Sequence, residues 1–342
     1  MDTLTVTEFG TFLGRHSERV VVRRKGEVVS EHPFIDLDHI LIGCNGVSIS
    51  SDLIRDCCER GIQITFLSSS GRPYAKVHSP TLNATVHTRR EQLLAYADGR
   101  GLSLVVAISA SKLANQAATL NYFAKYRKAA NPALYASLKD AAQAIQSLRD
   151  ELSAISSGTV DDMRPTILNL EGRAGALYWD AVKALVADRT TFTHREHQGA
   201  EEPLNAMLNY GYGILNGQVW SAVVLAGLEP FAGFLHVDRP GKPSLVLDLM
   251  EEFRQAAVDR PLLAAIGKGF SVEMERPDGA AQARLTDESR RAVAEKVLER
   301  LNTLELHAGK RHPLKAITQM QARAAAAHLR GESQYQPYSL RW

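Results

Sequence analysis

The chain has 342 residues and a formal net charge of +2, and 45% of its residues are hydrophobic and 23% charged. These values are ordinary for a globular protein with room for two domains, and the nearly neutral charge indicates no particular partner. We expect neither a disulfide framework nor a signal peptide, because the three cysteines lack a CxxC spacing and no basic stretch precedes an apolar run in the first residues. The longest apolar runs are far shorter than the roughly 20 residues of a membrane span, so we expect a cytoplasmic protein without a membrane partner.

Residues 1–85 are predicted to form a small β-rich domain. Short, β-branched and partly alternating segments such as ERVVVRRKGEVVSE are typical of strands, and residues 24–27 are the predicted tip of a hairpin. One helix, SSDLIRDCCERG, interrupts this region, with Ser51 or Asp52 as its N-cap and Gly61 as its stop. The segment GIQITFLSSSGRPYAKV then returns to strand.

Residues 86–342 are predicted to form a larger, mostly α-helical domain, so the fold class is α+β. Apolar residues recur at three-and-four spacing in segments such as LSLVVAISASKLANQAATLNYFAKYRKAA and SLVLDLMEEFRQAAVDRPLLAAIG. The segment SVEMERPDGAAQARLT interrupts these helices with strand-like alternation.

Two stretches of the chain are locally basic. Residues 71–90 contain four Lys or Arg and no acid, and residues 310–342 contain six against Glu332 alone. Such stretches can follow a phosphate backbone, although a solvated surface explains either stretch equally well.

Four residues carry the strongest chemical signal: Glu171, His236, Asp248 and Glu251. Each lies in a predicted helix or at a helix edge, among apolar or small residues that draw it toward a packed interior. Carboxylates brought together repel one another and lose hydration, so a divalent cation is the simplest neutraliser. One imidazole with carboxylates suits Mg²⁺ or Mn²⁺ better than Zn²⁺. Such an ion can neutralise charge that grows on a phosphodiester and can orient an attacking hydroxyl or water.

Each of these residues also has an ordinary explanation. Glu171 stands beside Gly172 and Gly175, which indicate the close approach of a backbone or a ligand, and a tight helix crossing with a surface glutamate would explain them too. His236 follows an apolar stretch, where a lone histidine is more often a hydrogen-bonded core residue. The loop after it contains Arg239 and Lys242, which could hold a phosphate nearby.

Asp248 and Glu251 stand at i and i+3, so they share one face of the predicted helix. Two partly buried carboxylates that close together need a cation. Arg254, three residues after Glu251, could satisfy that glutamate as an ordinary helix salt bridge without any metal.

Six further segments are informative as a set, and they are spread over nearly the whole chain. They are GCNGVSISSDLIRDCCERGIQITFLSSSGRPYAKV, SKLANQ, NLEGRAGALYW, PLNAMLNYGYGIL, GLEPFAGFLH and LVLDLMEEFRQAAVDR. Taken together they resemble the CRISPR-associated protein one family, the integrase-endonuclease of spacer acquisition. The resemblance implies Glu171, His236 and Glu251 as metal ligands and Asp248 as a further acid beside the metal. Gln255 departs from the proline that many relatives have after FR, which leaves the metal ligands untouched and can change how the helix continues.

The resemblance also implies an activity and partners. Family members form homodimers through their β domains, and two dimers clasp a dimer of CRISPR-associated protein two. The complex inserts short double-stranded DNA into a repeat array by attack of 3′-hydroxyls on phosphodiesters. Tyr178 lies in a family-like stretch and is a candidate DNA contact. Arg239 and Lys242, in the loop after His236, are candidate DNA contacts as well. Lys112 lies in another family-like stretch and is assigned a supporting role.

Two other functions remain open at this point. One is a non-catalytic DNA-binding scaffold in which the acids form structural ion pairs. The other is a repair nuclease that acts on branched DNA and uses the same residues. All the expected acids and the histidine are present, which favours an enzyme over a scaffold.

Overall fold

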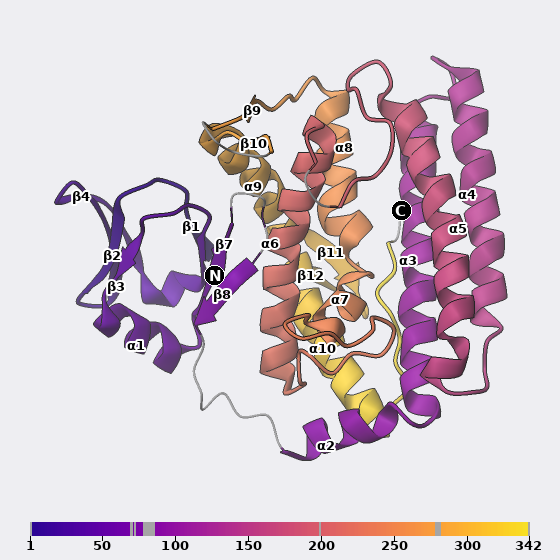
Figure 1. The fold of residues 1–342 in the computed structure, drawn as a ribbon, viewed down its shortest axis with the longest axis horizontal. Helices are drawn as coiled ribbons and strands as arrows, with labels where there is room; N and C mark the ends of the chain where they lie inside the picture. Colours follow the sequence, from indigo (N-terminus) through magenta and orange to yellow (C-terminus); the bar gives the residue numbers. More distant parts are fainter. Residues whose placement is uncertain are drawn as a thin grey trace. The chain divides into compact units, whose positions relative to one another are not determined.

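The computed structural model divides the chain into two compact units (Figure 1). It describes residues 2–68, 71, 73–77, 86–197, 200–277 and 282–340. The first unit comprises residues 1–83, 197–217 and 272–298, and the second comprises residues 84–196, 218–271 and 299–342. Two later segments, residues 197–217 and 272–298, therefore group with the N-terminal strands. The predicted single boundary at residue 85 assigned both segments to the helical domain.

Within the described residues, the first unit contains two four-stranded sheets. The strands of one sheet are, in order across it, β1 (Asp2–Val6), β5 (Leu37–Ile42), β7 (Gln63–Leu67) and β8 (Pro73–Val77). The strands of the other are β4 (Glu27–Pro33), β3 (Arg19–Arg24), β2 (Thr11–His16) and β6 (Ser48–Ile49). The remaining elements are η1 (Phe34–Asp36), α1 (Ser51–Arg60), β9 (Met274–Glu275), β10 (Arg284–Leu285) and most of α9 (Asp287–Asn302).

Local signals in the sequence explain the turns of this unit. The predicted hairpin tip is confirmed, since β3 and β4 pair on either side of Lys25 and Gly26, which have φ values of 50° and 87°. Gly61 ends α1 in the left-handed region with φ 73°, as predicted. The N-cap is Ser50 rather than Ser51 or Asp52, because the hydroxyl of Ser50 accepts the N–H of Leu53 at 3.3 Å.

The core of this unit forms where the two sheets and α1 bury their apolar side chains. Leu13, Val20, Ile40, Leu53 and Ile64 have no exposed surface. Parallel strands β5 and β7 pair along their length and are almost continuously buried, as expected of strands covered on both faces.

Helix α6 (Pro203–Ala226) belongs to the first unit as far as Gly217, and Gly213 lets it pass against the backbone at Gly71. A Cβ built on Gly213 would lie 1.5 Å from the carbonyl oxygen of Gly71, an overlap that only a backbone shift can relieve. We expect Gly213→Ala to lower the free energy of unfolding by at least about 1–3 kcal/mol, measured by urea denaturation.

Gly217 provides a matched control on the same helix. A Cβ there would meet Thr65 at 3.6 Å and His39 at 3.8 Å, which are ordinary contacts. Gly217→Ala should therefore be neutral or stabilise the fold by up to about 1 kcal/mol, because alanine favours the helix. Equal destabilisation by the two substitutions would show that the close approach at Gly213 does not limit stability.

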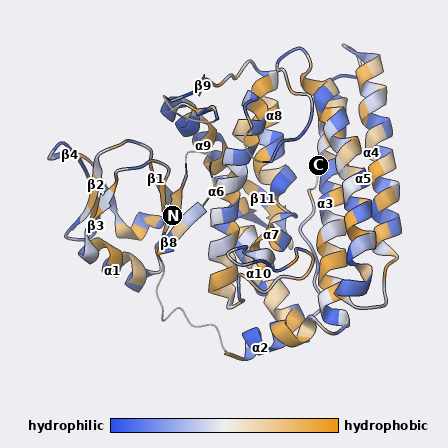
Figure 2. Cartoon of the chain, in the orientation of Figure 1, coloured by the Kyte–Doolittle hydropathy of each residue, from blue (hydrophilic) through white to orange (hydrophobic). Residues whose placement is uncertain are grey.

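The second unit is mainly helical, and the α+β fold class is confirmed. Helices α3, α4 and α5 lie side by side, and Figure 2 shows hydrophobic and hydrophilic residues alternating along all of them. In chain order its described elements are α2 (Val86–Ala95), α3 (Gly99–Lys125), α4 (Pro132–Ser153), α5 (Val160–Val186), the end of α6, α7 (Ser244–Met250), η2 (Gln255–Asp259), α8 (Arg260–Gly267), the end of α9, β11 (Leu304–His307), β12 (Lys310–Pro313) and α10 (Leu314–Leu329).

Within the described residues no single helix has both the length and the apolar character to cross a membrane. Helices α2 and α3 meet the length and composition test only as a pair bent by 85°.

Candidate functional site

Helix α5 carries Glu171 near its middle. The helix starts at a capping box in which Thr159 and Asp162 bond reciprocally, so its register is fixed from the first turn. Glu171 is 8% exposed. A Cβ built on Gly172 or Gly175 would meet no atom within 4 Å, so these glycines do not mark a tight helix crossing. The helix face beside Glu171 is instead open.

The ammonium of Lys112, from α3, joins Glu171 to Glu251. Its Nζ lies 2.8 Å from Oε2 of Glu171 and 3.0 Å from Oε2 of Glu251. Glu251 follows α7 as its C-terminal cap residue, and its other oxygen, Oε1, accepts a hydrogen bond from Arg254 at 2.8 Å. The salt bridge between Glu251 and Arg254 that the sequence left open is therefore present, together with a second cation that connects two remote acids.

Asp248 organises the loop that carries His236. Its carboxylate accepts hydrogen bonds from the backbone N–H groups of Phe234, Leu235 and His236, at 2.6, 3.1 and 3.0 Å. The ring Nδ1 of His236 lies 2.7 Å from the same carboxylate. Asp248 is therefore satisfied by the loop and the imidazole, and the need for a cation shared with Glu251 stays a prediction.

Electrostatic interactions link the imidazole to the glutamates. Burial lowers the pKa of His236, but its hydrogen bond to Asp248 and the charges of Asp248 and Glu251 outweigh burial, so this pKa is raised. Burial raises the pKa of Glu251, yet the charges of Arg254 and Lys112 outweigh it and hold this pKa well below its usual range. All four predicted residues therefore belong to one connected cluster.

The chemistry of this cluster fits a hard divalent cation. Oε1 of Glu171 is buried and accepts no hydrogen bond from any described residue, and Oε2 of Glu251 is buried with the ammonium of Lys112 3.0 Å away. Oxygen ligands of this kind with one imidazole suit Mg²⁺ or Mn²⁺. Among the residues that the structure describes, no three His, Cys, Asp or Glu side chains stand in ligating positions, and the ammonium of Lys112 lies between the two glutamates.

Tyr178 belongs to the core and does not reach DNA. It has no exposed surface, and its hydroxyl donates a hydrogen bond to Asp259 at 2.9 Å. Asp259 ends the π-helical turn η2, whose first residue, Gln255, also donates to it at 3.3 Å. The prediction of a DNA contact at Tyr178 is corrected by this burial, and the helix adopts its π-helical turn from Gln255 onward.

Arg239 and Lys242 lie in the loop after His236. The N–H of Lys242 donates to the carbonyl of Arg239 at 2.9 Å, which closes a tight turn. The charge of Lys242 lowers the pKa of His236 in opposition to Asp248, so Lys242 is within electrostatic reach of the cluster. Arg239 is exposed and lines a hollow of about 530 Å³ together with Glu229.

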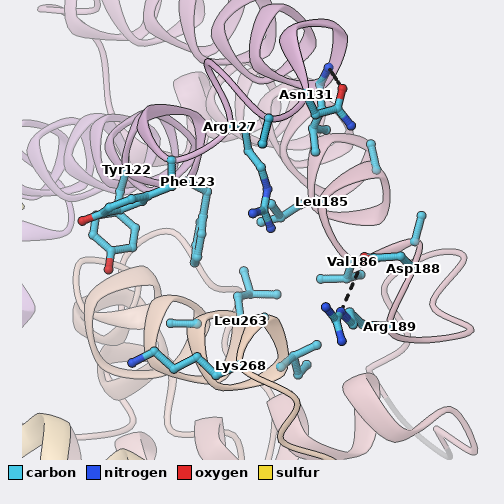
Figure 3. A pocket seen from close by; sticks show the side chains of 18 residues that line it. Tyr122, Phe123, Arg127, Asn131, Leu185, Val186, Asp188, Arg189, Leu263 and Lys268 are labelled. Carbon is cyan, nitrogen blue, oxygen red and sulfur yellow. Dashed lines mark hydrogen bonds and ion pairs between the residues drawn. The ribbon is translucent and has the colours of Figure 1, made fainter.

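A larger cavity of about 760 Å³ lies elsewhere in the second unit (Figure 3). It is lined by residues at the C-terminal ends of α3, α5 and α8, including Arg127, Arg189 and Lys268. Positive side chains are favourable at helix C-termini, so we assign these to helix stabilisation. The pair of Asp188 and Arg189, 3.2 Å apart, occupies its rim.

Comparison with known proteins identifies the family. Residues 4–299 match the profile described as CRISPR associated protein Cas1. The chain belongs to the Cas1 family. It is 36% identical to CRISPR-associated endonuclease Cas1 1 of Archaeoglobus fulgidus over 99% of both chains, and 34% identical to its namesake in Francisella tularensis subsp. novicida over 100% of both. The resemblance noted in the sequence is confirmed.

Solved structures agree with the Cas1 fold. A casposase bound to integration product superposes with a TM-score of 0.81 at 22% identity, covering 98% of this chain and 92% of that one. A Cas1 protein from Thermotoga maritima superposes with a TM-score of 0.76 at 18% identity, covering 98% and 99%.

In this member of the Cas1 family the C-terminal segment supports the backbone next to Glu251. The neighbouring Glu252 is fully buried and accepts hydrogen bonds from the hydroxyl of Tyr335 and from the N–H of Tyr338, the latter at 2.7 Å. Residues 332–340 thus hold the chain immediately after a predicted metal ligand. Sequence reasoning missed this role, because no local pattern connects Glu252 to residues more than 80 positions away.

Asn115 completes this support from α3. Its Nδ2 donates to the carbonyl of Glu252 at 2.8 Å, and its Oδ1 accepts the N–H of Leu340 at 2.8 Å. Asn115→Ala should lower the free energy of unfolding by about 2–4 kcal/mol in urea denaturation, because it leaves two buried backbone groups unsatisfied. Asn121→Ala is the control, since that half-buried side chain on the same helix bonds only the exposed Lys139 among described partners. It should change stability by less than about 0.5 kcal/mol, and an equal loss would contradict the prediction.

Proposed function

We propose that this protein is a metal-dependent DNA endonuclease and integrase that inserts short DNA fragments into a CRISPR array by 3′-hydroxyl attack on phosphodiesters. Membership of the Cas1 family supports the proposal, as do relatives named endonucleases that match over nearly their full length. The observation that carries it is the cluster in which Lys112 joins two buried glutamates from separate elements, with His236 in electrostatic reach.

We propose Glu171, His236 and Glu251 as the residues that hold Mg²⁺ or Mn²⁺. The ion, when bound, would neutralise the charge that develops on the phosphodiester and lower the pKa of an attacking oxygen. Glu171 contributes a buried oxygen, Oε1, with no hydrogen-bond donor among the described residues, and Glu251 contributes a buried oxygen, Oε2, which the ammonium of Lys112 contacts. His236 is held through Nδ1, so its Nε2 is the nitrogen left for a ligand role.

The remaining residues of the cluster orient these groups and receive the substrate. Asp248 fixes both the loop and the imidazole of His236 through four hydrogen-bonding contacts. The open helix face at Gly172 and Gly175 gives a DNA strand room beside Glu171. Lys242 and Arg239 are proposed to contact DNA phosphates.

We also propose double-stranded DNA, a second copy of the chain and Cas2 as partners. Solved structures of the same fold include a Cas6-RT-Cas1–Cas2 complex and a casposase bound to integration product. We propose the cytoplasm as its location, where it would meet the DNA proposed as its substrate.

The test is a strand-transfer assay with a short duplex carrying free 3′-hydroxyls, a supercoiled plasmid carrying a repeat, and Mn²⁺ or Mg²⁺. The proposed function predicts joined products that disappear when the metal is chelated. Cut products without joining would favour the nuclease for branched DNA, and salt-sensitive binding without any cut or joined product would favour the scaffold.

A further inference from the structure

We propose that Lys112 is a built-in counter-cation that holds the acid cluster together in the metal-free protein and competes with the divalent ion for the same carboxylate oxygens. The inference rests on the proposed metal-dependent function and adds a means of regulating metal affinity. It assigns Lys112 a positioning role that its place in a family-like stretch did not reveal.

The geometry shows for which carboxylate oxygens the ammonium of Lys112 and the metal ion would compete. Nζ of Lys112 lies 2.8 Å from Oε2 of Glu171 and 3.0 Å from Oε2 of Glu251, and the three side chains are 15%, 8% and 5% exposed. Arg254 contacts the opposite oxygen of Glu251, Oε1, at 2.8 Å. The two cations therefore differ, since Lys112 stands between the acids whereas Arg254 approaches one of them from outside.

Charge balance explains why Lys112 is needed. Glu171 and Glu251 are both buried, and buried carboxylates are costly unless positive charges compensate them. Lys112 and Arg254 supply two positive charges against these two negative ones. The charges of these four side chains thus cancel before any ion arrives, and a divalent cation must overcome the repulsion of an ammonium that already occupies the space between its ligands.

The lysine side chain can leave without moving its helix. Its flexible four-carbon stem lets the ammonium rotate away. The helix around it is fixed, because Ser111 donates to the carbonyl of Tyr338 and Asn115 donates to the carbonyl of Glu252. Exchange of ammonium for metal therefore requires a change of side-chain rotamer and no rearrangement of α3.

The test measures binding of Mn²⁺ alone, by isothermal titration calorimetry, to the full chain and to Lys112→Met. The variant should bind Mn²⁺ at least about tenfold more tightly, the smaller end of the effect that one neighbouring charge has on the proton affinity of a site. It should also melt at a lower temperature without metal and gain more thermal stability from Mn²⁺ than the unchanged protein, because ligand stabilisation grows with affinity.

Three further variants make the result specific. Lys112→Arg keeps the cation and should retain the affinity of the unchanged protein. Adding Glu171→Gln to Lys112→Met should remove the gain, which locates the ion at this cluster. Lys139→Met replaces an exposed lysine that bonds Asn121, so it should change nothing. If Lys112→Met does not fold, Lys112→Gln takes its place and should show the same gain.

The outcomes separate this inference from the proposed function. Unchanged or weaker Mn²⁺ binding in Lys112→Met, while the unchanged protein binds Mn²⁺, would overturn the competition and leave the metal site intact. Failure of both proteins to bind Mn²⁺ would instead overturn the proposed metal dependence and the competition with it. Tighter Mn²⁺ binding by Lys112→Met than by the unchanged protein supports both the competition and the proposed metal dependence.

Discussion

Replacing Glu171 with glutamine should reduce metal-dependent strand transfer by at least about 100-fold, because a bound ion supplies several kcal/mol of transition-state stabilisation. The substitution keeps the shape of the side chain and removes one of the two charges that Lys112 joins. Lys112 remains paired with Glu251, so the fold should survive. The assay is joining of a duplex with 3′-hydroxyls to a supercoiled plasmid, with thermal melting to verify folding.

The matched control for this substitution is Glu151→Gln. Glu151 is an exposed glutamate on α4 whose nearest cation is Arg173, 3.9 Å away. Exposed pairs of this kind contribute little to stability, so the control should keep full activity and an unchanged melting temperature. Strand transfer at the normal rate by a folded Glu171→Gln protein would remove Glu171 from the catalytic cluster.

Asp248→Asn is expected to lower both stability and activity. The carboxylate receives two N–H donors at Oδ2 and two nitrogen contacts at Oδ1, and an amide must turn its NH₂ group toward one of these pairs. Two buried donors then lose their acceptor, which costs about 2–6 kcal/mol at 1–3 kcal/mol each. His236 also loses the group that fixes its ring, so metal affinity should fall by about 10–100-fold.

Chemical denaturation and calorimetry with Mn²⁺ measure the two effects separately. Asp238→Asn is the control, since Asp238 is an exposed acid in the same loop and should change stability by less than about 0.5 kcal/mol. An Asp248→Asn protein with the denaturation midpoint and Mn²⁺ affinity of the unchanged chain would contradict the role assigned to Asp248.

Local sequence signals predicted the parts of the fold that depend on a few neighbouring residues. The hairpin at Lys25 and Gly26 and the stop of α1 at Gly61 both require left-handed backbone, which glycine supplies at low cost. The N-cap at Ser50 was missed by one residue, because several serines and an aspartate in a row can each cap a helix.

The sequence indicates which residues form the candidate site, but it does not indicate which of them contact one another. Acids and a histidine in apolar surroundings stand out in a sequence, and Arg254 follows Glu251 at helical spacing. The contact between Lys112 and Glu171 spans 59 positions, so only the packing of α3 against α5 creates it. Asp248 bonds backbone N–H groups 12 to 14 positions earlier, which no side-chain pattern encodes.

The burial of Tyr178 also depends on a contact with a residue far away in the sequence. The place of Tyr178 in a family-like stretch favoured a contact with DNA. The partner that draws it inward, Asp259, lies 81 positions away in a π-helical turn. A polar ring on a helix face therefore cannot be assigned to solvent or core until the opposing element is known.

The anchoring of Glu252 by Tyr335 and Tyr338 has a consequence for biosynthesis. A ribosome must add more than 80 residues after Glu252 before the groups that hold it exist. A nascent chain therefore carries every proposed catalytic side chain well before it can position Glu251. Cutting of DNA by an incomplete nascent chain is therefore disfavoured. Premature termination before Tyr335 should yield truncated chains that contain the acidic residues without an ordered site.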